Sequence, residues 1–453
     1  MRPVLTSLAV LALISAAGCG SRAHQTTPVA DDSASSTDQA VRNPPMDASA
    51  DPDQPDQQAH VQPDQDAGVT LSSCPAAQLL HSLGKSRLLF GAKMSDAYAN
   101  TASWDLRYIY LAGTISDGAN VCAACGSCTS DGVTCSNEGP GCGWWGCWQD
   151  AAIAPGQHLR SFLAKAKAAN QLPLVSYYTF FNTSGLAEGP GELASATNVQ
   201  RMSRYFADYR FALQQIGSAV AFVHLEPDLW GYAEQLNPDP SKIPVAVSTG
   251  NPTDCPSDPN TFSGFGRCMV AMARKYAPNA KVGLQASGWG SGTDVIFNRT
   301  PGLDVTSLGT GTANFLASSG GREADFVVLE TSWDAAWYDT QGVNRWLDAT
   351  NQTLPNFHQL LTWASAVTAT LNKPAMFWQT PVGNLALPNV SGAWKDNRVD
   401  YFFDHPDELA KAGVFGAVFG SGGDGMTEPE NDQGNLRSRF NGYLAKGGEA
   451  PCP

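Results

Sequence analysis

Acidic residues recur just beyond two short apolar segments of this 453-residue chain. Glu226 and Asp228 follow one segment directly, and Glu330 ends another, with Asp334 four residues beyond it. Two carboxyl groups on opposite sides of a reacting carbon can divide the work between a proton donor and a nucleophile or base. We therefore take these four residues as the candidate catalytic groups.

Glu226 and Glu330 are the favoured pair among these acids. Glu226 alternates with Phe222 and His224, so the three side chains would share one face of a strand, and Glu330 ends a segment of the same pattern. We expect Glu226 to act as general acid/base and Glu330 as nucleophile or base. Asp228 or Asp334 could take the place of either one. Any of them could instead only support the rim beside an arginine or a helix N-terminus.

Aromatic and amide side chains gather beside these acids. A flat ring gives the apolar face of a pyranose a surface to stack on, and amides can bind its hydroxyl groups. The pattern predicts a carbohydrate-binding rim, although any single member could pack in the core. Tyr177 and Tyr178 fall on opposite strand faces, so only one can reach the cavity. The candidate binding residues are Tyr177, His224, Trp230, Gln285, Trp289, Trp333, Trp337, Trp378 and Gln379.

Eight apolar, β-rich segments alternate with amphipathic stretches, which predicts parallel strands joined by helical crossovers. This arrangement favours a closed (β/α)8 barrel over an open doubly wound sheet, which stays the alternative because the first crossover, Ser95–Ser103, is short. The predicted strands are Ser86–Lys93, Leu106–Gly113, Leu172–Phe180, Ala219–Leu225, Lys281–Ala286, Asp325–Glu330, Pro374–Gln379 and Gly413–Gly420. The predicted helices are Gly156–Ala169, Asn198–Ile216, Gly264–Tyr276, Leu303–Ser319, Asn356–Leu371, Arg398–Ala412 and Asn435–Lys446.

A barrel of this kind would bring the candidate residues together. Chemistry in (β/α)8 barrels lies at the carboxyl ends of the strands, which is where the acids and aromatic residues fall. Inward side chains of alternate strands share a layer, so Glu226 of strand four would lie across the mouth from Glu330 of strand six.

The ending Leu225-Glu226-Pro227 resembles the Asn-Glu-Pro ending of strand four in the large clan of retaining (β/α)8 glycoside hydrolases, whose glutamate is the acid/base. The resemblance implies hydrolysis of glycosidic bonds. The chain departs from that pattern in two places, with Leu225 in place of the asparagine and Gln379 where the clan has its nucleophile on strand seven. A pairing of strands four and six resembles instead the α-galactosidase type of barrel, which uses aspartates. A non-catalytic carbohydrate-binding or adhesive barrel is the alternative function.

Eleven cysteines point to an oxidising compartment. Cys74 and Cys452 stand at the two ends of the folded region and could clamp them, and Cys255 and Cys268 could close a local loop. A further cluster of six cysteines opens with C-x2-C-x2-C, a spacing that is also found in metal sites. Export favours disulfides instead, so we expect a disulfide-stapled loop over residues 117–150 that forms one wall of the cleft. The cluster comprises Cys122, Cys125, Cys128, Cys135, Cys142 and Cys147.

The first 73 residues divide into two segments that differ from the rest. Residues 1–19 have an arginine, an apolar run and small residues before Cys19, which resembles a bacterial lipoprotein signal with Cys19 as the lipidated residue. Residues 20–73 are rich in Asp, Pro and Gln and hold half of the chain's net charge of −14, which predicts a disordered acidic tether. Residues 74–453 would form the barrel, lipid-anchored in the cell envelope and facing the periplasm or the exterior.

The overall composition excludes a disulfide miniprotein, a polytopic membrane protein and a basic nucleic-acid binder. The chain contains no phosphate-binding loop, dinucleotide fingerprint, HExxH motif or nucleophile elbow, so we expect neither a cofactor nor a catalytic metal. We expect a monomer whose partner is its carbohydrate substrate, with membrane contact only through the lipid anchor and no nucleic acid bound.

Overall fold

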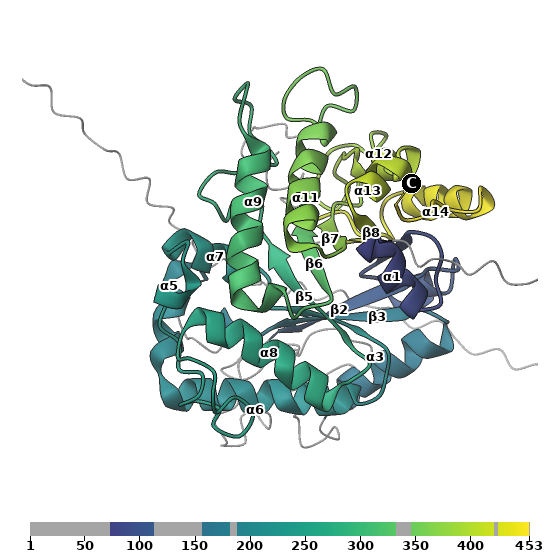
Figure 1. Ribbon diagram of the computed structural model, residues 1–453. Helices are drawn as coiled ribbons and strands as arrows, with labels where there is room; N and C mark the ends of the chain where they lie inside the picture. The colour runs from purple at the N-terminus through teal and green to yellow at the C-terminus, as the bar shows by residue number, and fades with distance from the viewer. Residues whose placement is uncertain (1–72, 113–155, 182–187, 332–345, 421–424, 453) are drawn as a thin grey trace, which may run out of the picture. The chain divides into compact units, whose positions relative to one another are not determined.

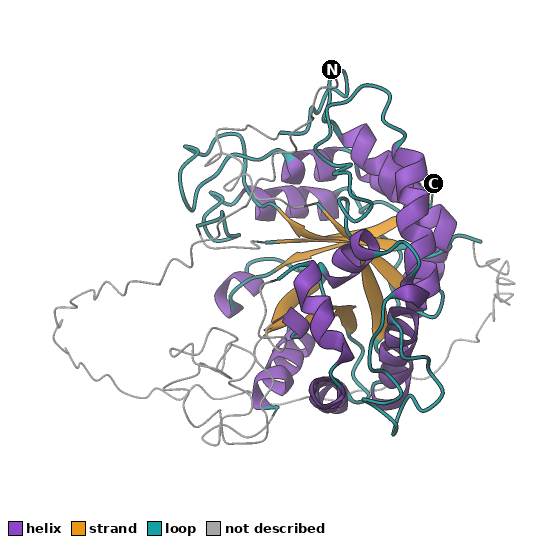
Figure 2. Ribbon diagram, turned by 90° about the vertical axis from the view of Figure 1, so that its left-hand side faces the viewer, coloured by secondary structure: helices purple, strands orange, loops and turns teal. Residues whose placement is uncertain are grey.

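The computed structural model describes residues 73–112, 156–181, 188–331, 346–420 and 425–452. Eight parallel strands close into a barrel in chain order, and helices surround them (Figure 1, Figure 2). The predicted (β/α)8 barrel is confirmed, and the open sheet is excluded because β1 pairs with both β2 and β8. The strands are β1 (Leu89–Ala92), β2 (Leu106–Ala112), β3 (Leu172–Tyr178), β4 (Phe222–Leu225), β5 (Lys281–Ala286), β6 (Phe326–Glu330), β7 (Ala375–Thr380) and β8 (Val414–Phe419).

Polar caps set where several helices begin. The side chains of Asn198, Thr261 and Asn356 each accept a hydrogen bond from a backbone N–H in the first turn of the helix that follows. The α-helices are α1 (Pro75–Ser82), α2 (Asp96–Ala99), α3 (Gln157–Ala168), α5 (Pro190–Ala194), α6 (Val199–Ile216), α7 (Leu229–Leu236), α8 (Phe262–Tyr276), α9 (Val305–Leu316), α11 (Phe357–Leu371), α12 (Arg398–Asp404), α13 (Pro406–Lys411) and α14 (Asn435–Ala445). Short helical turns are η3 (Ser195–Thr197), η4 (Pro240–Lys242) and η5 (Ala317–Gly321).

Two crossovers differ from a regular barrel. The first holds only the four-residue helix α2, which is capped by Ser95, so the short crossover still allows the barrel to close. The helix predicted over Arg398–Ala412 is broken into α12 and α13 because Pro406 lacks the N–H that would continue the ladder.

The barrel interior is filled by apolar side chains that point inward from the strands. Leu89, Leu174, Phe222 and Phe415 are fully buried there, and Trp378 closes the interior toward the mouth with 2% of its surface exposed. Gly283 of β5 makes room for this packing, since a Cβ there would lie 2.5 Å from the Phe326 ring. The barrel is therefore a packed core and not a pore.

Helix α1 packs on the apolar barrel interior through Leu79 and Leu80, beside β8 (Figure 1). A disulfide joins Cys74, which precedes α1, to Cys452 near the other end of the described chain, with a Cα–Cα distance of 6.2 Å. The predicted terminal clamp is confirmed, and it also holds α1 in place.

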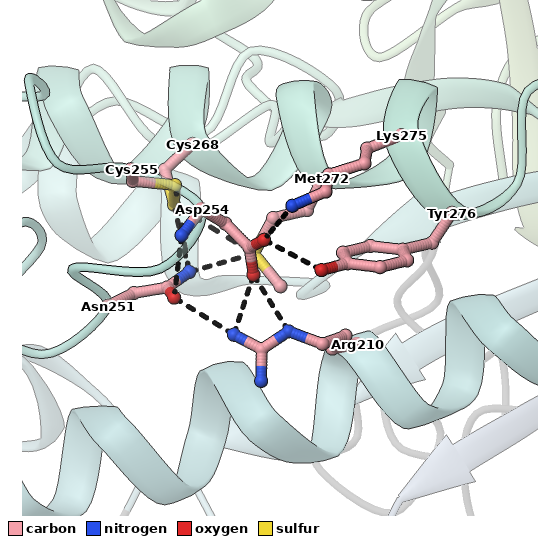
Figure 3. A network of polar contacts seen from close by, with 8 residues as sticks. All are labelled: Arg210, Asn251, Asp254, Cys255, Cys268, Met272, Lys275 and Tyr276. Carbon is pink, nitrogen blue, oxygen red and sulfur yellow. Dashed lines mark hydrogen bonds and ion pairs between the residues drawn. A yellow bond between two sulfur atoms is a disulfide. The ribbon is translucent and has the colours of Figure 1, made fainter.

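The second predicted disulfide, Cys255–Cys268, is also confirmed. It fixes the loop before α8 to that helix, and the same loop is tied to α6 through Asp254 (Figure 3). The carboxylate of Asp254 accepts hydrogen bonds from Arg210 at 2.8 Å and from Tyr276 at 2.7 Å. This network stabilises the helical layer outside β4 and β5.

Several predicted features lie outside the described residues. They are the signal segment with Cys19, the acidic tether, the six-cysteine cluster, and Trp333, Asp334 and Trp337. None of the helices in the described part of the chain combines the length and apolarity needed to cross a bilayer.

Candidate active site

Partly exposed polar and aromatic side chains meet at the carboxyl ends of the strands. Tyr178 ends β3, Asp228 follows β4, Trp289 follows β5 and Gln379 lies in β7, and each retains some exposed surface. Glu330, the last residue of β6, joins them with 5% of its surface exposed. The mouth predicted from the strand ends is therefore present.

Asp228 is the acid that β4 contributes to this mouth. Its Oδ1 accepts a hydrogen bond from Nε2 of Gln285 at 3.0 Å, and its Oδ2 lies 3.4 Å from the hydroxyl of Tyr178. Tyr178 also contacts the carboxylate of Glu188. Asp228 therefore lies among groups from β3, β5 and the segment before α5.

Glu330 lies on the β6 side of the same mouth. Its Oε2 accepts a hydrogen bond from the indole Nε1 of Trp289 at 3.0 Å. The Trp289 ring packs against Tyr232 of α7 with centroids 4.7 Å apart, which fixes the direction of the N–H. The hydrogen bond from Trp289 therefore holds the Glu330 carboxyl in place at the mouth.

The two carboxyl groups at the mouth act on each other. Burial raises the pKa of Asp228 well above its ordinary value, and the charge of Glu330 raises it further, followed by that of Glu188. The hydrogen bond from Gln285 acts in the opposite direction. Asp228 is thus biased toward the protonated form while its neighbour Glu330 supplies negative charge.

Glu226 does not take the place that the sequence predicts for it. Its side chain is 0% exposed, and its carboxyl accepts hydrogen bonds from the Tyr205 hydroxyl at 2.7 Å and from the backbone N–H groups of Thr179 and Phe180 at 3.3 and 3.2 Å. Burial raises its pKa to about 8. Glu226 therefore connects the end of β3 to α6, and the predicted pairing of Glu226 with Glu330 is corrected to Asp228 with Glu330.

The backbone conformation after β4 explains why Asp228 faces the mouth and Glu226 does not. Glu226 has a φ of 42° and Asp228 a φ of 67°, so the strand alternation that His224 follows stops at Leu225. The side chain of Glu226 consequently turns to the helical layer, and that of Asp228 returns over the mouth.

Two other predicted binding residues belong to the core. Tyr177 is buried outside the barrel, where its hydroxyl donates to Asp208 of α6 at 2.9 Å, and it is its neighbour Tyr178 that reaches the mouth. Trp230 is 1% exposed, donates its Nε1 hydrogen to the carbonyl of Leu225 at 2.7 Å and packs on Phe262. Both predictions as substrate contacts are wrong.

The remaining predicted residues divide between the interior and the mouth. His224 is 0% exposed beneath the mouth, with its ring edge against Trp378, so neither of these two reaches a substrate directly. Gln285 is buried as well and contacts Asp228. Gln379, with a φ of 55°, remains partly exposed and donates to the hydroxyl of Tyr110.

Of the two neighbouring tyrosines the sequence reasoning chose Tyr177 where Tyr178 reaches the mouth, and it did not name Glu188 or Tyr110. The strand alternation of β3 indicates Tyr178. Leu174 points into the barrel, and every second residue of a strand lies on the same face, so Tyr178 points inward as well. Nothing comparable marks Glu188, which comes to the mouth from a connecting segment.

No family model matches the chain, and no curated protein matches it. Several glycoside hydrolases of known structure are similar to it in fold. A family 26 endo-β-1,4-mannanase from Cellulomonas fimi is 14% identical over 82% of this chain and 74% of its own, with a TM-score of 0.44. An endo-1,4-β-mannanase from Rhizomucor miehei is 12% identical over 80% of this chain and 96% of its own, with a TM-score of 0.43. An endo-β-1,4-mannanase from Thermotoga petrophila is 11% identical over 80% of this chain and 77% of its own, with a TM-score of 0.42.

Proposed function

We propose that the barrel hydrolyses glycosidic bonds of a polysaccharide or oligosaccharide, with Asp228 and Glu330 as its two carboxylates. The observation that carries the proposal is their meeting at the mouth from strands four and six, where burial and then the charge of Glu330 raise the pKa of Asp228. Paired acids whose surroundings favour different protonation states are the arrangement that glycoside hydrolysis requires.

Asp228 would act as the general acid. It gives its proton to the glycosidic oxygen as the bond between that oxygen and the anomeric carbon breaks, so the leaving sugar departs with a neutral hydroxyl. The hydroxyl of Tyr178 lies 3.4 Å from Oδ2 of Asp228, and this contact keeps the carboxyl of Asp228 oriented toward the mouth.

Glu330 would act on the other side of the anomeric carbon. As a carboxylate held by Trp289 Nε1, it either attacks that carbon directly or removes a proton from the attacking water. Water supplies the new anomeric hydroxyl in both cases, and NMR of the first product formed distinguishes retention from inversion.

Aromatic groups at the mouth support a sugar substrate. Trp289 and Tyr232 pack together, and both retain partly exposed surface beside Glu330. A pyranose ring could stack on this surface while Glu188 and Gln379 bind its hydroxyl groups.

The test is a screen of the purified protein against a panel of glycans, with release of reducing ends as the measurement. We expect hydrolysis of at least one glycan and its loss, by roughly a thousandfold or more, in Asp228→Asn. Undiminished hydrolysis by Asp228→Asn would remove Asp228 from the acid role.

A carbohydrate-binding barrel without catalysis is the second candidate. It is favoured by the end of β7, where Gln379 stands and its amide is engaged by Tyr110. Glycan binding by calorimetry without any released reducing ends, in the parent and in Asp228→Asn alike, would support this candidate instead.

Export and lipid anchoring are further parts of the proposal. The two disulfides, Cys74–Cys452 and Cys255–Cys268, support an oxidising compartment. We expect Cys19 to incorporate labelled fatty acid in cells and Cys19→Ser to be released from the membrane fraction. Light scattering of the purified chain tests the expected monomer.

A further inference from the structure

A row of buried polar side chains lies beneath Asp228, and none of its members takes part in a step of the proposed hydrolysis. Ser176, His224 and Gln285, each 0% exposed, point into the barrel from β3, β4 and β5. Ser176 and His224 are register partners, and His224 is next to Gly283, two residues before Gln285. A buried polar group is costly unless it is hydrogen-bonded, so this row needs an account of its own.

The contacts at both ends of the row are known. The Ser176 hydroxyl lies 3.2 Å from Nδ1 of His224. At the other end, Nε2 of Gln285 donates to Oδ1 of Asp228 at 3.0 Å and to the hydroxyl of Ser287 at 3.1 Å. Both hydrogens of the Gln285 amide are therefore used.

Two buried atoms in the middle of the row are left to satisfy each other. Among the described residues, neither Nε2 of His224 nor Oε1 of Gln285 has a hydrogen-bond partner of normal geometry. Burial lowers the pKa of His224 to about 3, and a side-chain hydrogen bond with Gln285 acts against that fall. His224 is thus neutral, and one of its two nitrogens has the proton.

The chemistry of these groups gives the row a single direction. Oε1 of Gln285 can only accept, so the facing Nε2 of His224 must have the proton, which leaves Nδ1 as an acceptor for the Ser176 hydroxyl. We propose that Ser176 and His224 are positioning residues, which fix the Gln285 amide through a one-way hydrogen-bond chain so that its NH2 group faces Asp228. The proposal rests on the proposed function in that Asp228 is the acid of the site.

The chain matters because an amide can turn over. With NH2 toward Asp228, Gln285 stabilises the ionised carboxylate, whereas the reversed amide would place its carbonyl oxygen there and favour the protonated form. The chain therefore lowers the pKa of Asp228 and offsets part of the effect of burial and of Glu330, so that the acid can release its proton.

Other groups also act on Asp228 and must be constant in any test. They are Tyr178 of β3, Glu188 before α5, Tyr232 of α7 and Glu330 of β6. None of these residues belongs to the chain, and the variants below leave all of them in place. His224 itself is packed against Trp378 of β7.

The experiment measures the pKa of Asp228 without a substrate. Protein labelled with 13Cγ-aspartate is titrated by NMR, and Asp228→Asn identifies the resonance. We expect His224→Leu to raise the pKa of Asp228 by about one unit. His224→Gln, whose amide N–H can replace the Nε2 hydrogen, should return it close to the parent value.

Two further variants keep the test decisive. Leu89→Ala removes volume from the same interior on β1, which pairs with β2 and β8 and not with the strands of the chain, so it should lower the thermal midpoint and leave the pKa of Asp228 unchanged. Ser176→Ala removes only the first donor and serves if His224→Leu does not fold, with a raised pKa of Asp228 expected.

The proposal is wrong if the pKa of Asp228 stays at the parent value in His224→Leu. If that variant does not fold, an unchanged pKa in Ser176→Ala decides in the same way. His224 would then be a packing residue. Failure of the proposed function gives a different result, namely no hydrolysis by the parent while the NMR shifts persist. In an active protein, His224→Leu should also move the alkaline limb of kcat to higher pH, with KM little changed.

Discussion

Three residues at the strand ends adopt a left-handed backbone although none is glycine. Glu226, Asp228 and Gln379 have φ values of 42°, 67° and 55°. Such conformations cost of order 1–3 kcal/mol each, and they persist only where surrounding contacts compensate. The compensation here is the buried hydrogen bonding of Glu226 and the contacts of Asp228 and Gln379 at the mouth.

Glu226 and Asp228 provide a matched pair for mutation because they are two residues apart. We expect Glu226→Gln to keep hydrolysis within a few-fold of the parent, since its amide oxygen can still accept from Tyr205 and Thr179 and only the bond from Phe180 is lost. Asp228→Asn should reduce kcat by roughly a thousandfold because it removes the transferable proton. Initial rates with the best glycan measure both, and the reverse order of effects would return the acid role to Glu226.

Trp289 contributes a ring and an N–H that mutation can separate. Trp289→Phe keeps an aromatic surface but removes the donor to Glu330, and we expect kcat to fall roughly ten- to a hundredfold, as for loss of a hydrogen bond to a charged group. Tyr232→Phe, which keeps the stacked ring, is the control and should change kcat little. Equal losses in the two variants would assign the effect to packing.

At the scale of elements, helix α1 and the terminal disulfide act together. Cys74–Cys452 closes a loop of 378 residues and holds Leu79 and Leu80 against the barrel interior. Cys255–Cys268 spans only 13 residues. A longer loop loses more entropy when it is closed in the unfolded chain, so the terminal bridge should stabilise the domain more.

We expect the double variant Cys74→Ser, Cys452→Ser to lose about 2–5 kcal/mol of unfolding free energy. Urea denaturation followed by circular dichroism measures the loss, and the rate of hydrolysis at 25 °C should be unchanged because α1 packs on the barrel away from the mouth. The double variant Cys255→Ser, Cys268→Ser is the control. A larger loss in that control would show that local packing outweighs loop entropy.

At the scale of the whole molecule, buried carboxyls tie stability to pH. Burial raises the pKa of Glu192 and of Glu226 to about 8, and that of Glu234 to about 7. Burial acts on Asp254 too, but hydrogen bonds from Lys275, Tyr276 and Arg210 outweigh it and lower its pKa to about 2. The two groups of acids therefore act in different pH ranges.

The sign follows from proton binding. Between an unfolded pKa of 4.5 and about 8, the folded chain holds protons on the raised glutamates that the unfolded chain has released, so stability falls as pH rises through this window. Asp254 acts below its unfolded pKa of 3.8, where stability is lost as pH falls toward 2. We expect the thermal midpoint to be highest near pH 4–5 and to drop by several degrees by pH 8.

Differential scanning calorimetry from pH 3 to pH 9 measures this profile. Glu226→Gln removes one titrating group but keeps its acceptor oxygen, so the fall between pH 5 and pH 8 should be smaller than in the parent. An identical slope in the variant would show that Glu226 is not protonated in the folded chain.

Strand and helix positions could be predicted from the sequence because burial imposes a regular pattern. Each of the eight predicted apolar segments overlaps a strand, and Lys281–Ala286 is matched end to end. Short elements such as α2 and α5 could not be predicted in the same way, because four or five residues contain too little periodicity. The break at Pro406 was readable from the proline itself.

Residue chemistry and strand order were enough to place acids and aromatic rings at one mouth and to pair strand four with strand six. The tertiary structure alone decided which acid of Glu226 and Asp228 faces Glu330. The physical reason is that period-two alternation holds only while the backbone stays extended. The left-handed φ at Glu226 is fixed by hydrogen bonds from Tyr205 of α6 and from Phe180 just after β3, both of which are distant in sequence.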